Sequence, residues 1–389
     1  MTSSPLVSVV IPCYNYGKYL NATIDSVLYS TFQDFEIIVV DDGSNDSATV
    51  EVIKSLKDKP KTRIIRQSNK GVAAARNNGI AAAKGKYILP LDAEDLIHPT
   101  FIEKAFWIME FYPQVGFVSS WVQAFGTEKW TNDSPQYNFY NQLFHNHVCG
   151  TSVFRKEAFI QAGGYKSGFV VMGYEDWDFW ISLGEKGWYG FQIFERLFYY
   201  RRHGRSMIHQ AIEHHDELVK QIQGRHPALY HLNNLEKLRQ TWNDSPVLQL
   251  TPLLAKNSPW HSYPIKPMHH NRKRWLLIMP LIRRAQLQPA SLNFIDGLHA
   301  DHHAVTMVAT QFLTGSNMEE FDWLTDDIFH LSLYVPKIEL KLDMMERMIS
   351  KLIVSRGIER VFLLSSRQGH YLRPYLAKSF PNIPFDIVD

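Results

Sequence analysis

The first hundred residues alternate between short apolar runs and longer stretches with apolar positions at helical spacing. Runs rich in β-branched residues predict strands at 6–12, 35–40, 62–67 and 86–91. The intervening stretches predict helices within 18–32, 49–56 and 71–85. This βα alternation predicts a parallel sheet with helices on both faces.

The pattern loosens after residue 110 and resumes near residue 273. Residues 211–272 are polar and partly helical, and we expect a helical connector there. The βα pattern of residues 273–389 predicts a second, Rossmann-like α/β unit, following the nucleotide-binding α/β domain expected at 1–210. Because the chain ends on an expected strand, we expect this second unit to be incomplete, with a further C-terminal domain beyond it.

Composition narrows the setting of the protein. Lysine plus arginine total 41 and aspartate plus glutamate total 39, so no charge excess indicates nucleic acid as a partner. The two cysteines, Cys13 and Cys149, form no CxxC motif, which argues against a disulfide framework or a thiolate zinc site. No apolar run reaches the ~20 residues of a membrane helix. We expect the protein in the cytoplasm, free or peripheral to the membrane.

Carboxylates follow two of the predicted strands. Asp41 and Asp42 follow one, and Asp92, Glu94 and Asp95 follow another. Ligands of open α/β sheets bind beyond the carboxyl ends of the strands. Asp41 and Asp42 are alternatively simple caps of the next helix. Close carboxylates repel, and Mg²⁺ or Mn²⁺ held together with substrate phosphates relieves that repulsion.

Two further polar groups lie later in the chain. Glu175 and Asp176 begin a predicted helix in "GYEDWDFW", where they alternatively only compensate the helix dipole. The second group is basic and lies in "YYRRHGRSM", with Arg201, Arg202, His203 and Arg205. Arginine side chains suit the binding of phosphate, although a solvated basic loop is the simpler interpretation.

Four stretches in order carry a family resemblance. They are "VSVVIPCYNYGKYL", "FEIIVVDDGSNDSA", "NKGVAAARNNGIAAAKGKYILPLDAED" and "GYEDWDFW". Together they resemble glycosyltransferase family 2, whose members have the GT-A fold and use nucleotide sugars. The resemblance covers about residues 6 to 210, and residues 273–389 resemble more weakly the first half of a GT-B glycosyltransferase.

The resemblance implies a donor site. Asp42 would accept a hydrogen bond from the base, expected to be uracil, and Asp41 would support that turn. The implied nucleotide-binding set is Pro12, Tyr14, Asn15, Asp41, Asp42, Lys70, Gly71, Arg76 and Asp92. The acidic metal-binding motif has Glu94 where the family has aspartate, so Glu94 and Asp95 compete as ligand beside Asp92. His203 is a further candidate for the divalent metal.

The resemblance also implies an acceptor site. Asp176 would be the general base, Glu175 would position the acceptor hydroxyl or donor sugar, and Asp178 would be a solvated neighbour or an ion-pair partner. Trp177 would offer an apolar platform to an acceptor sugar. Arg201 and Arg205 would lie on the diphosphate side, and acceptor choice would lie in residues 122–148.

The expected activity is therefore an inverting, metal-assisted transfer of sugar from a nucleoside diphosphate sugar. The donor is expected to be UDP-linked and the acceptor a hydroxyl of a saccharide or glycan, as in cell-surface polysaccharide synthesis. Two alternatives stay open. One is a nucleotidyltransferase, which would not need Glu175 and Asp176. The other is a non-catalytic sugar-nucleotide-binding module.

Overall fold

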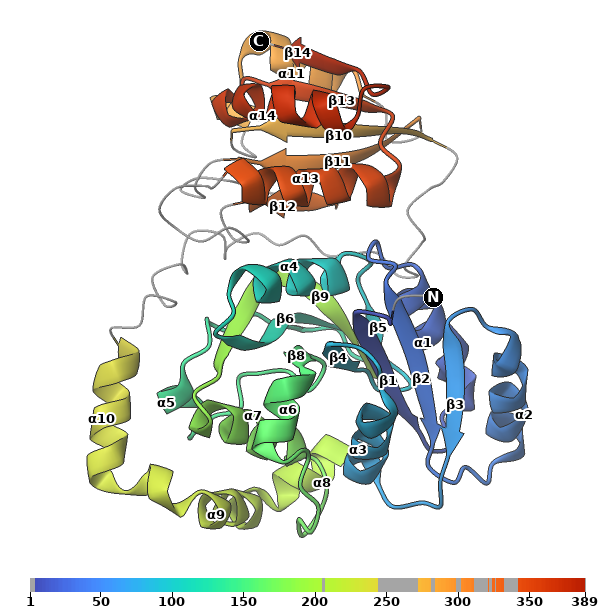
Figure 1. The fold of residues 1–389 in the computed structure, drawn as a ribbon. Coiled ribbons are helices and arrows are strands. Elements are labelled where there is room, and N and C mark those ends of the chain that lie inside the picture. Colours follow the sequence, from blue (N-terminus) through green and yellow to red (C-terminus); the bar gives the residue numbers. More distant parts are fainter. Residues whose placement is uncertain are drawn as a thin grey trace. The chain divides into compact units, whose positions relative to one another are not determined.

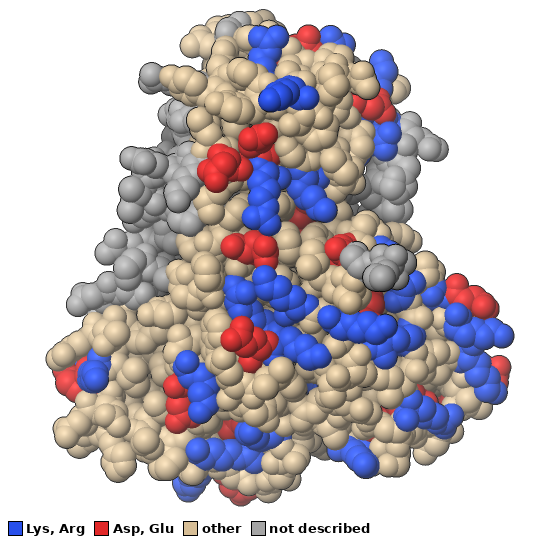
Figure 2. Space-filling model, in the orientation of Figure 1, with Lys and Arg blue, Asp and Glu red and all other residues tan. Residues whose placement is uncertain are grey.

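The computed structural model describes residues 4–204, 207–243, 272–280, 284–298, 302–310, 321, 324–325, 327–331 and 342–388. The chain forms two compact units, and the division falls near residue 249 (Figure 1). None of the described helices is both long and apolar enough to cross a bilayer. Figure 2 shows acidic and basic side chains interspersed on the face in view, in keeping with the net charge of +2.

The first unit is built on one mixed sheet, with nine strands among the described residues in the order β3-β2-β1-β4-β8-β6-β9-β5 and β7 beside β6. Its parallel half contains β1 (Val7–Cys13), β2 (Phe35–Asp41), β3 (Thr62–Arg66) and β4 (Tyr87–Pro90). The other half contains β5 (Leu96–Ile97), β6 (Val115–Gly126), β7 (Thr131–Asn132), β8 (Val153–Arg155) and β9 (Tyr189–Arg202). The predicted βα alternation and parallel pairing are confirmed for the first four strands.

Helices connect and cover these strands. They are α1 (Gly17–Leu28), α2 (Ser47–Ser55), α3 (Val72–Ala82), α4 (Phe101–Phe111), α5 (Phe139–Gln142), α6 (Lys156–Ala162) and α7 (Glu175–Glu185). The short 3₁₀ turn η1 (Leu56–Asp58) extends α2. Gly79 lets α3 approach the sheet, since a Cβ there would lie 2.4 Å from Val10 Cγ1. This close packing fixes the helix that carries Arg76.

The region predicted as a connector belongs in part to the first unit. It forms α8 (Met207–Glu213), α9 (His215–Arg225), the 3₁₀ turn η2 (Pro227–Tyr230) and α10 (Leu232–Asn243). Ala211, Leu218, Ile222 and Trp242 are buried in the same hydrophobic cluster as side chains of α7. Apolar faces on these helices therefore complete the core of the first unit, which extends past residue 210, where the sequence analysis expects a boundary. Residues 244–271 of the predicted connector lie outside the described residues.

The second unit has a parallel sheet in the order β12-β11-β10-β13-β14. The strands are β10 (Lys273–Met279), β11 (His303–Ala309), β12 (Ile328–His330), β13 (Arg360–Leu364) and β14 (Phe385–Val388). The described helical segments are η4 (Arg284–Gln286), α11 (Pro289–Asp296), α13 (Leu342–Arg356) and α14 (Arg367–Ser379), with α13 and α14 packed side by side (Figure 1). The order follows the doubly wound pattern and confirms the Rossmann-like expectation. The resemblance to half of a GT-B enzyme stays a prediction.

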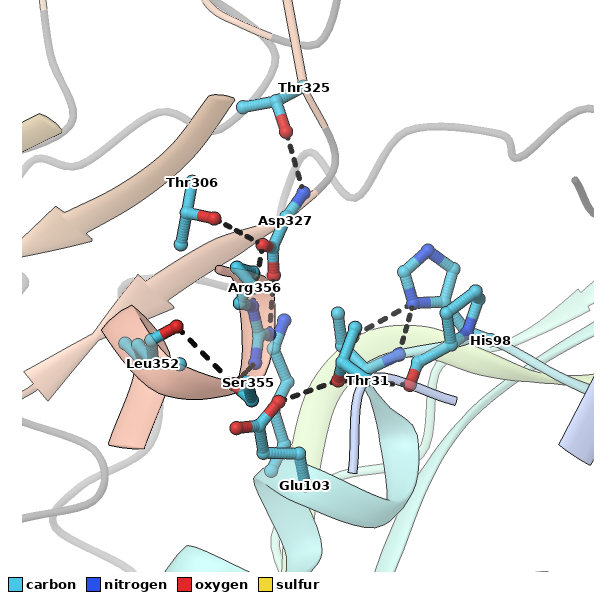
Figure 3. Close-up of polar contacts among 12 residues, drawn as sticks. Thr31, His98, Glu103, Thr306, Thr325, Asp327, Leu352, Ser355 and Arg356 are labelled. Atoms are coloured by element: carbon cyan, nitrogen blue, oxygen red, sulfur yellow. Dashed lines mark hydrogen bonds and ion pairs between the residues drawn. The ribbon is translucent and has the colours of Figure 1, made fainter. Parts of the chain in front are cut away.

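A buried ion pair stabilises this second unit (Figure 3). Arg356 donates to both carboxylate oxygens of Asp327, with Nη2 to Oδ1 at 2.9 Å and Nε to Oδ2 at 3.0 Å. Thr306 Oγ1 also donates to Asp327 Oδ2, at 2.6 Å. This bidentate arginine–carboxylate pair links the end of α13 to the residue that precedes β12.

Candidate active site

The loop after β2 is held by its own carboxylates. Asp41 Oδ1 accepts a hydrogen bond from Ser44 N at 2.8 Å. Asp42 Oδ1 accepts from Lys70 N and its Oδ2 accepts from Gly71 N, both at 2.9 Å. The cap of α2 is instead Asp46. Asp41 and Asp42 are therefore not helix caps, and Asp42 fixes the loop that leads into α3.

The loop after β1 is tied to the same region. Asn15 has a left-handed backbone, with φ of 60°, and its Oδ1 accepts from the backbone N–H groups of Asn45 and Asp46, each at 3.0 Å. Tyr14 beside it is 40% exposed, whereas Pro12 is buried within β1. The Asn15 side chain thus holds two strand-end loops together.

The two acidic groups predicted from the sequence lie in one cavity of about 480 Å³. Its lining includes Asp92, Glu94 and Asp95 after β4, Glu175 and Asp176 at the start of α7, and Arg76 from α3. The other residues of the implied nucleotide-binding set do not line this cavity. They lie on the adjoining loops after β1, β2 and β3, or at the ends of β1 and β2 themselves.

Arg76 joins the two acidic groups. Its Nη2 lies 2.8 Å from Asp92 Oδ1, and its Nη1 lies 2.9 Å from Glu175 Oε1. Burial disfavours the charge of Arg76, but Asp92 and Glu175 outweigh burial and raise its pKa above the ordinary value. Glu175 Oε2 also accepts from Gly173 N at 2.8 Å. Glu175 therefore does more than compensate the helix dipole, because both of its oxygens have fixed partners.

Glu94 and Asp95 differ in what they bind. Asp95 is 1% exposed and accepts a hydrogen bond from Arg201 N at 2.8 Å, which fixes the end of β9. The Glu94 side chain is 19% exposed and lies 3.7 Å from His203 Nε2. Burial and the neighbouring Asp92 raise the pKa of Glu94 to about 8, and burial together with Glu94 and Asp92 raises the pKa of Asp95 well above its usual range. The geometry therefore favours Glu94 over Asp95 as a ligand.

The fit of a divalent metal can be judged from these groups. Within the described residues, no three histidine, cysteine, aspartate or glutamate side chains converge into a ready-made metal site. Mg²⁺ does not need one, because it is usually held by one or two carboxylates together with substrate phosphates. Asp92 and Glu94 face one cavity and repel each other. These residues fit a metal that binds jointly with a diphosphate.

The Asp176 carboxylate lies at the cavity and accepts hydrogen bonds from two groups. Its Oδ1 accepts from Trp177 N at 2.7 Å, and its Oδ2 accepts from Asn146 Nδ2 at 3.3 Å. Burial and Glu175 raise the pKa of Asp176 to about 7, against the opposing effect of Arg76. Sequence reasoning missed Asn146, because its contact with Asp176 spans 30 residues and no local pattern marks it.

One expectation about the acidic helix is wrong, and an alternative for its neighbour Asp178 is decided. Trp177 is 3% exposed and its Nε1 donates to Gln142 O at 2.6 Å, so its ring is part of the core and offers no sugar platform. Of the two alternatives for Asp178, the ion-pair partner is confirmed and the solvated neighbour is not. Asp178 is 1% exposed and pairs with His226 Nε2 at 3.3 Å and Arg225 Nη1 at 3.6 Å. The charged end of α9 thus supports α7.

The basic segment is ordered by β9 and is not a simple solvated loop. Arg201 Nε donates to Glu94 O at 2.7 Å, and its guanidinium lies 4.7 Å from the ring centre of Tyr19. The His203 ring lies 4.9 Å from the same tyrosine. Burial and nearby cations lower the pKa of His203, which favours the neutral imidazole needed by a metal ligand. Arg205 lies outside the described residues.

Comparisons with known proteins agree with this geometry. A family model for glycosyl transferase family 2 matches residues 8–166. An uncharacterized glycosyltransferase of Methanocaldococcus jannaschii is 33% identical over 206 residues, which is 50% of this chain and 69% of the relative. The chain belongs to glycosyltransferase family 2, and it is a glycosyltransferase with a GT-A-like first unit.

Other matches are shorter or more distant. The chondroitin synthase of Pasteurella multocida is 42% identical over 100 residues, covering 25% of this chain but only 10% of that protein. The structure of S. aureus TarS residues 1–349 in complex with UDP is 17% identical, with a TM-score of 0.46, covering 62% of this chain and 69% of that one.

Proposed function

We propose that this enzyme transfers a sugar from a UDP-sugar to a hydroxyl of a saccharide acceptor, with inversion at the anomeric carbon. The observation that carries the proposal is the shared cavity. It places Asp92 and Glu94, which suit a metal and a diphosphate, in the same space as Asp176, which suits an acceptor hydroxyl.

Asp176 is the proposed general base. A base works best when its pKa lies near the working pH, and the pKa of Asp176 is raised to about 7. Its ionised carboxylate would take the proton of the acceptor hydroxyl as the oxygen attacks the anomeric carbon. Glu175 is not the proposed base, because its two oxygens already accept hydrogen bonds from Arg76 and from Gly173 N. It is proposed to position the reacting groups instead.

Inversion follows from a single displacement. A retaining route through a glycosyl-enzyme intermediate needs a second carboxylate as nucleophile, as in retaining glycosidases. Glu175 is poorly suited to that role because Arg76 and Gly173 hold its lone pairs. The sugar is therefore expected to pass directly from the diphosphate to the acceptor.

The donor end has a separate set of residues. Asp92 and Glu94 would hold Mn²⁺ or Mg²⁺, which supplies charge stabilisation for the leaving diphosphate when bound. Asp42, at the end of β2, is the proposed partner of the uracil ring, next to the 67–71 loop that it orders. The family assignment and the Asp176 site favour this function over the nucleotidyltransferase alternative.

Calorimetric titration with UDP, with and without MnCl₂, tests the donor site. The wild type is expected to bind UDP more tightly with Mn²⁺, and Asp92→Ala is expected to lose that gain. Glu51→Ala is the control, because Glu51 is an exposed helix residue in α2. Equal UDP affinity with and without Mn²⁺ in the wild type would contradict the metal-assisted site.

A screen of UDP-sugars for UDP release then identifies the donor. Proton NMR of the product gives the anomeric configuration, and a retained configuration would contradict the single displacement. Release of pyrophosphate from UTP and a sugar 1-phosphate would instead support the nucleotidyltransferase.

A further inference from the structure

One face of the sheet forms a wall of the cavity that contains Asp176. The lining takes alternate residues from neighbouring strands, namely Trp130, Asn132 and Ser134 around β7, Ser120 and Val122 of β6, and Phe198, Tyr200 and Arg202 of β9. Successive side chains of a strand point to opposite faces, so this period of two defines a continuous surface. Val122 of β6 pairs with Asn132 of β7 on one side and with Phe198 of β9 on the other, so the three strands lie side by side in this wall.

Trp130 is the exposed aromatic ring of this wall. It is 38% exposed, whereas Trp121, Trp177 and Trp180 are buried. Its ring centre lies 5.9 Å from that of Tyr200, and the residue that pairs with Tyr200 on β6 is the small Ala124. Trp130 O accepts a hydrogen bond from Ala124 N at 2.8 Å, so its backbone is fixed to the sheet.

An ion pair lies beside the indole. Glu128 Oε1 pairs with Arg202 Nη2 at 3.0 Å. The backbone bond from Ala124 and the ring contact with Tyr200 hold Trp130 at the cavity. The exposed part of Trp130 is therefore a preorganised apolar surface at the cavity.

A pyranose ring matches such a wall. One of its faces presents C–H groups, which pack against aromatic rings, and its edges carry hydroxyl groups that need polar partners. Asn132 and Ser134 follow Trp130 on the same strip, and Ser134 Oγ donates to Asn132 Oδ1 at 3.0 Å. Apolar surface with a few fixed polar groups is typical of a small-ligand site.

We propose that Trp130 is the stacking platform of the acceptor subsite and that the strip from Trp130 to Ser134 binds a saccharide. The inference rests on the proposed function, which it deepens by naming the residues that recognise the acceptor. Trp130 takes the role that the buried Trp177 cannot fill.

Saturation-transfer NMR on the full chain, with UDP and MnCl₂ present, tests the subsite. The probes are cellobiose, lactose, N-acetyllactosamine and chitobiose. The wild type is expected to bind at least one of them, with the strongest transfer to protons on a single face of one ring. Trp130→Ala is expected to weaken that binding about 10-fold, the effect of one lost aromatic contact, while Trp130→Phe retains most of it. Tyr371→Ala, which removes an exposed ring from α14, is the control and is expected to bind like the wild type.

UDP affinity separates this inference from the proposed function. Unchanged UDP binding in Trp130→Ala, together with lost saccharide binding, supports the platform. Equal saccharide binding by Trp130→Ala and the wild type overturns the inference but does not contradict the proposed donor site. Binding of farnesyl phosphate but of no saccharide would overturn it too, because the wall would then serve a lipid. If the wild type itself does not bind UDP, that result would instead contradict the proposed function.

Discussion

The two units place different chemistry at the ends of similar parallel strands. In the second unit, Thr310 follows β11 and its Oγ1 lies 2.9 Å from Ser366 Oγ, which in turn accepts from Gly369 N and caps α14. In the first unit, the corresponding ends carry Asp92 and Glu94, and burial raises the pKa of Glu94. Among the described residues, hydroxyl groups in one unit satisfy each other, whereas carboxylates in the other repel.

The buried arginines show the same contrast. Arg356 forms a bidentate ion pair with Asp327, and both side chains are at most 4% exposed. Arg76 is shared between Glu175 and Asp92, and the Asp92 side chain is 34% exposed to the cavity. A parallel sheet is thus a scaffold, and function depends on which charges its strand ends leave unsatisfied.

The largest expected effect is that of Asp176→Asn on the first unit. Loss of the general base is expected to slow transfer by ~10²–10⁴-fold, because the acceptor hydroxyl keeps its proton. Initial rates of UDP release measure this, and UDP affinity is expected to stay unchanged. Asp216→Asn is the matched control, since Asp216 is an exposed aspartate in the first turn of α9. Equal rates for Asp176→Asn and the wild type would remove Asp176 from the mechanism.

The next effect concerns the bidentate pair of the second unit. Asp327→Ala removes the carboxylate that binds two nitrogens of the buried Arg356, and it is expected to cost about 3–5 kcal/mol in the free energy of unfolding of that unit. Urea unfolding followed by circular dichroism measures the loss, and UDP binding by the first unit is expected to persist. Asp386→Ala breaks the more exposed pair with Arg360, and we expect a much smaller loss there because solvent screens that pair. Similar losses for both variants would show that burial does not distinguish them.

A smaller effect is expected for Glu94→Gln. The pKa of Glu94 in the folded protein is about 8, above its ordinary value of 4.5, so the ionised carboxylate destabilises the fold as pH rises through this interval. Without metal at pH 8.5, the variant is therefore expected to have a Tm a few degrees above that of the wild type. With UDP present, it is expected to lose most of the rise in Tm that Mn²⁺ produces.

Glu51→Gln, in the exposed pair with Lys54, is the control for that experiment. A Glu94→Gln variant that keeps the full Mn²⁺ effect would reassign the metal to Asp95. Thermal denaturation at pH 6 and pH 8.5 separates the charge effect from simple loss of packing, because the gain in Tm should shrink at the lower pH.

The smallest effect is expected for Asn146→Ala. The Asn146 amide lowers the pKa of Asp176, so its removal raises that pKa. Transfer by the wild type is expected to increase as pH rises through about 7, where Asp176 ionises. In the variant this rise is expected to move up by about 0.5 pH unit. Asn141→Ala, at another exposed asparagine of the same region, is expected to leave the profile in place, and a downward move in Asn146→Ala would contradict the assignment.

Local patterns were sufficient for the parallel half of the fold. The apolar runs that become β1, β2 and β4 are each followed by polar residues, and parallel pairing must bring such ends to one edge. The acids Asp41, Asp42 and Asp92 were therefore identifiable from their positions after these runs. Asp176 was identifiable from its family motif, and the doubly wound second unit from its βα alternation.

Long-range packing decided the rest. The pair between Arg76 and Glu175 spans 99 residues, and sequence periodicity does not say which buried acid an arginine will meet. Periodicity also does not distinguish Trp177, which the core covers, from Trp130, which it leaves exposed at the cavity. The sequence by itself determined the strands, the helices and the acids at their ends, because these follow from local spacing. Only the tertiary structure decided which charges meet and which aromatic ring stays open, because burial depends on distant segments that cover one face and not the other.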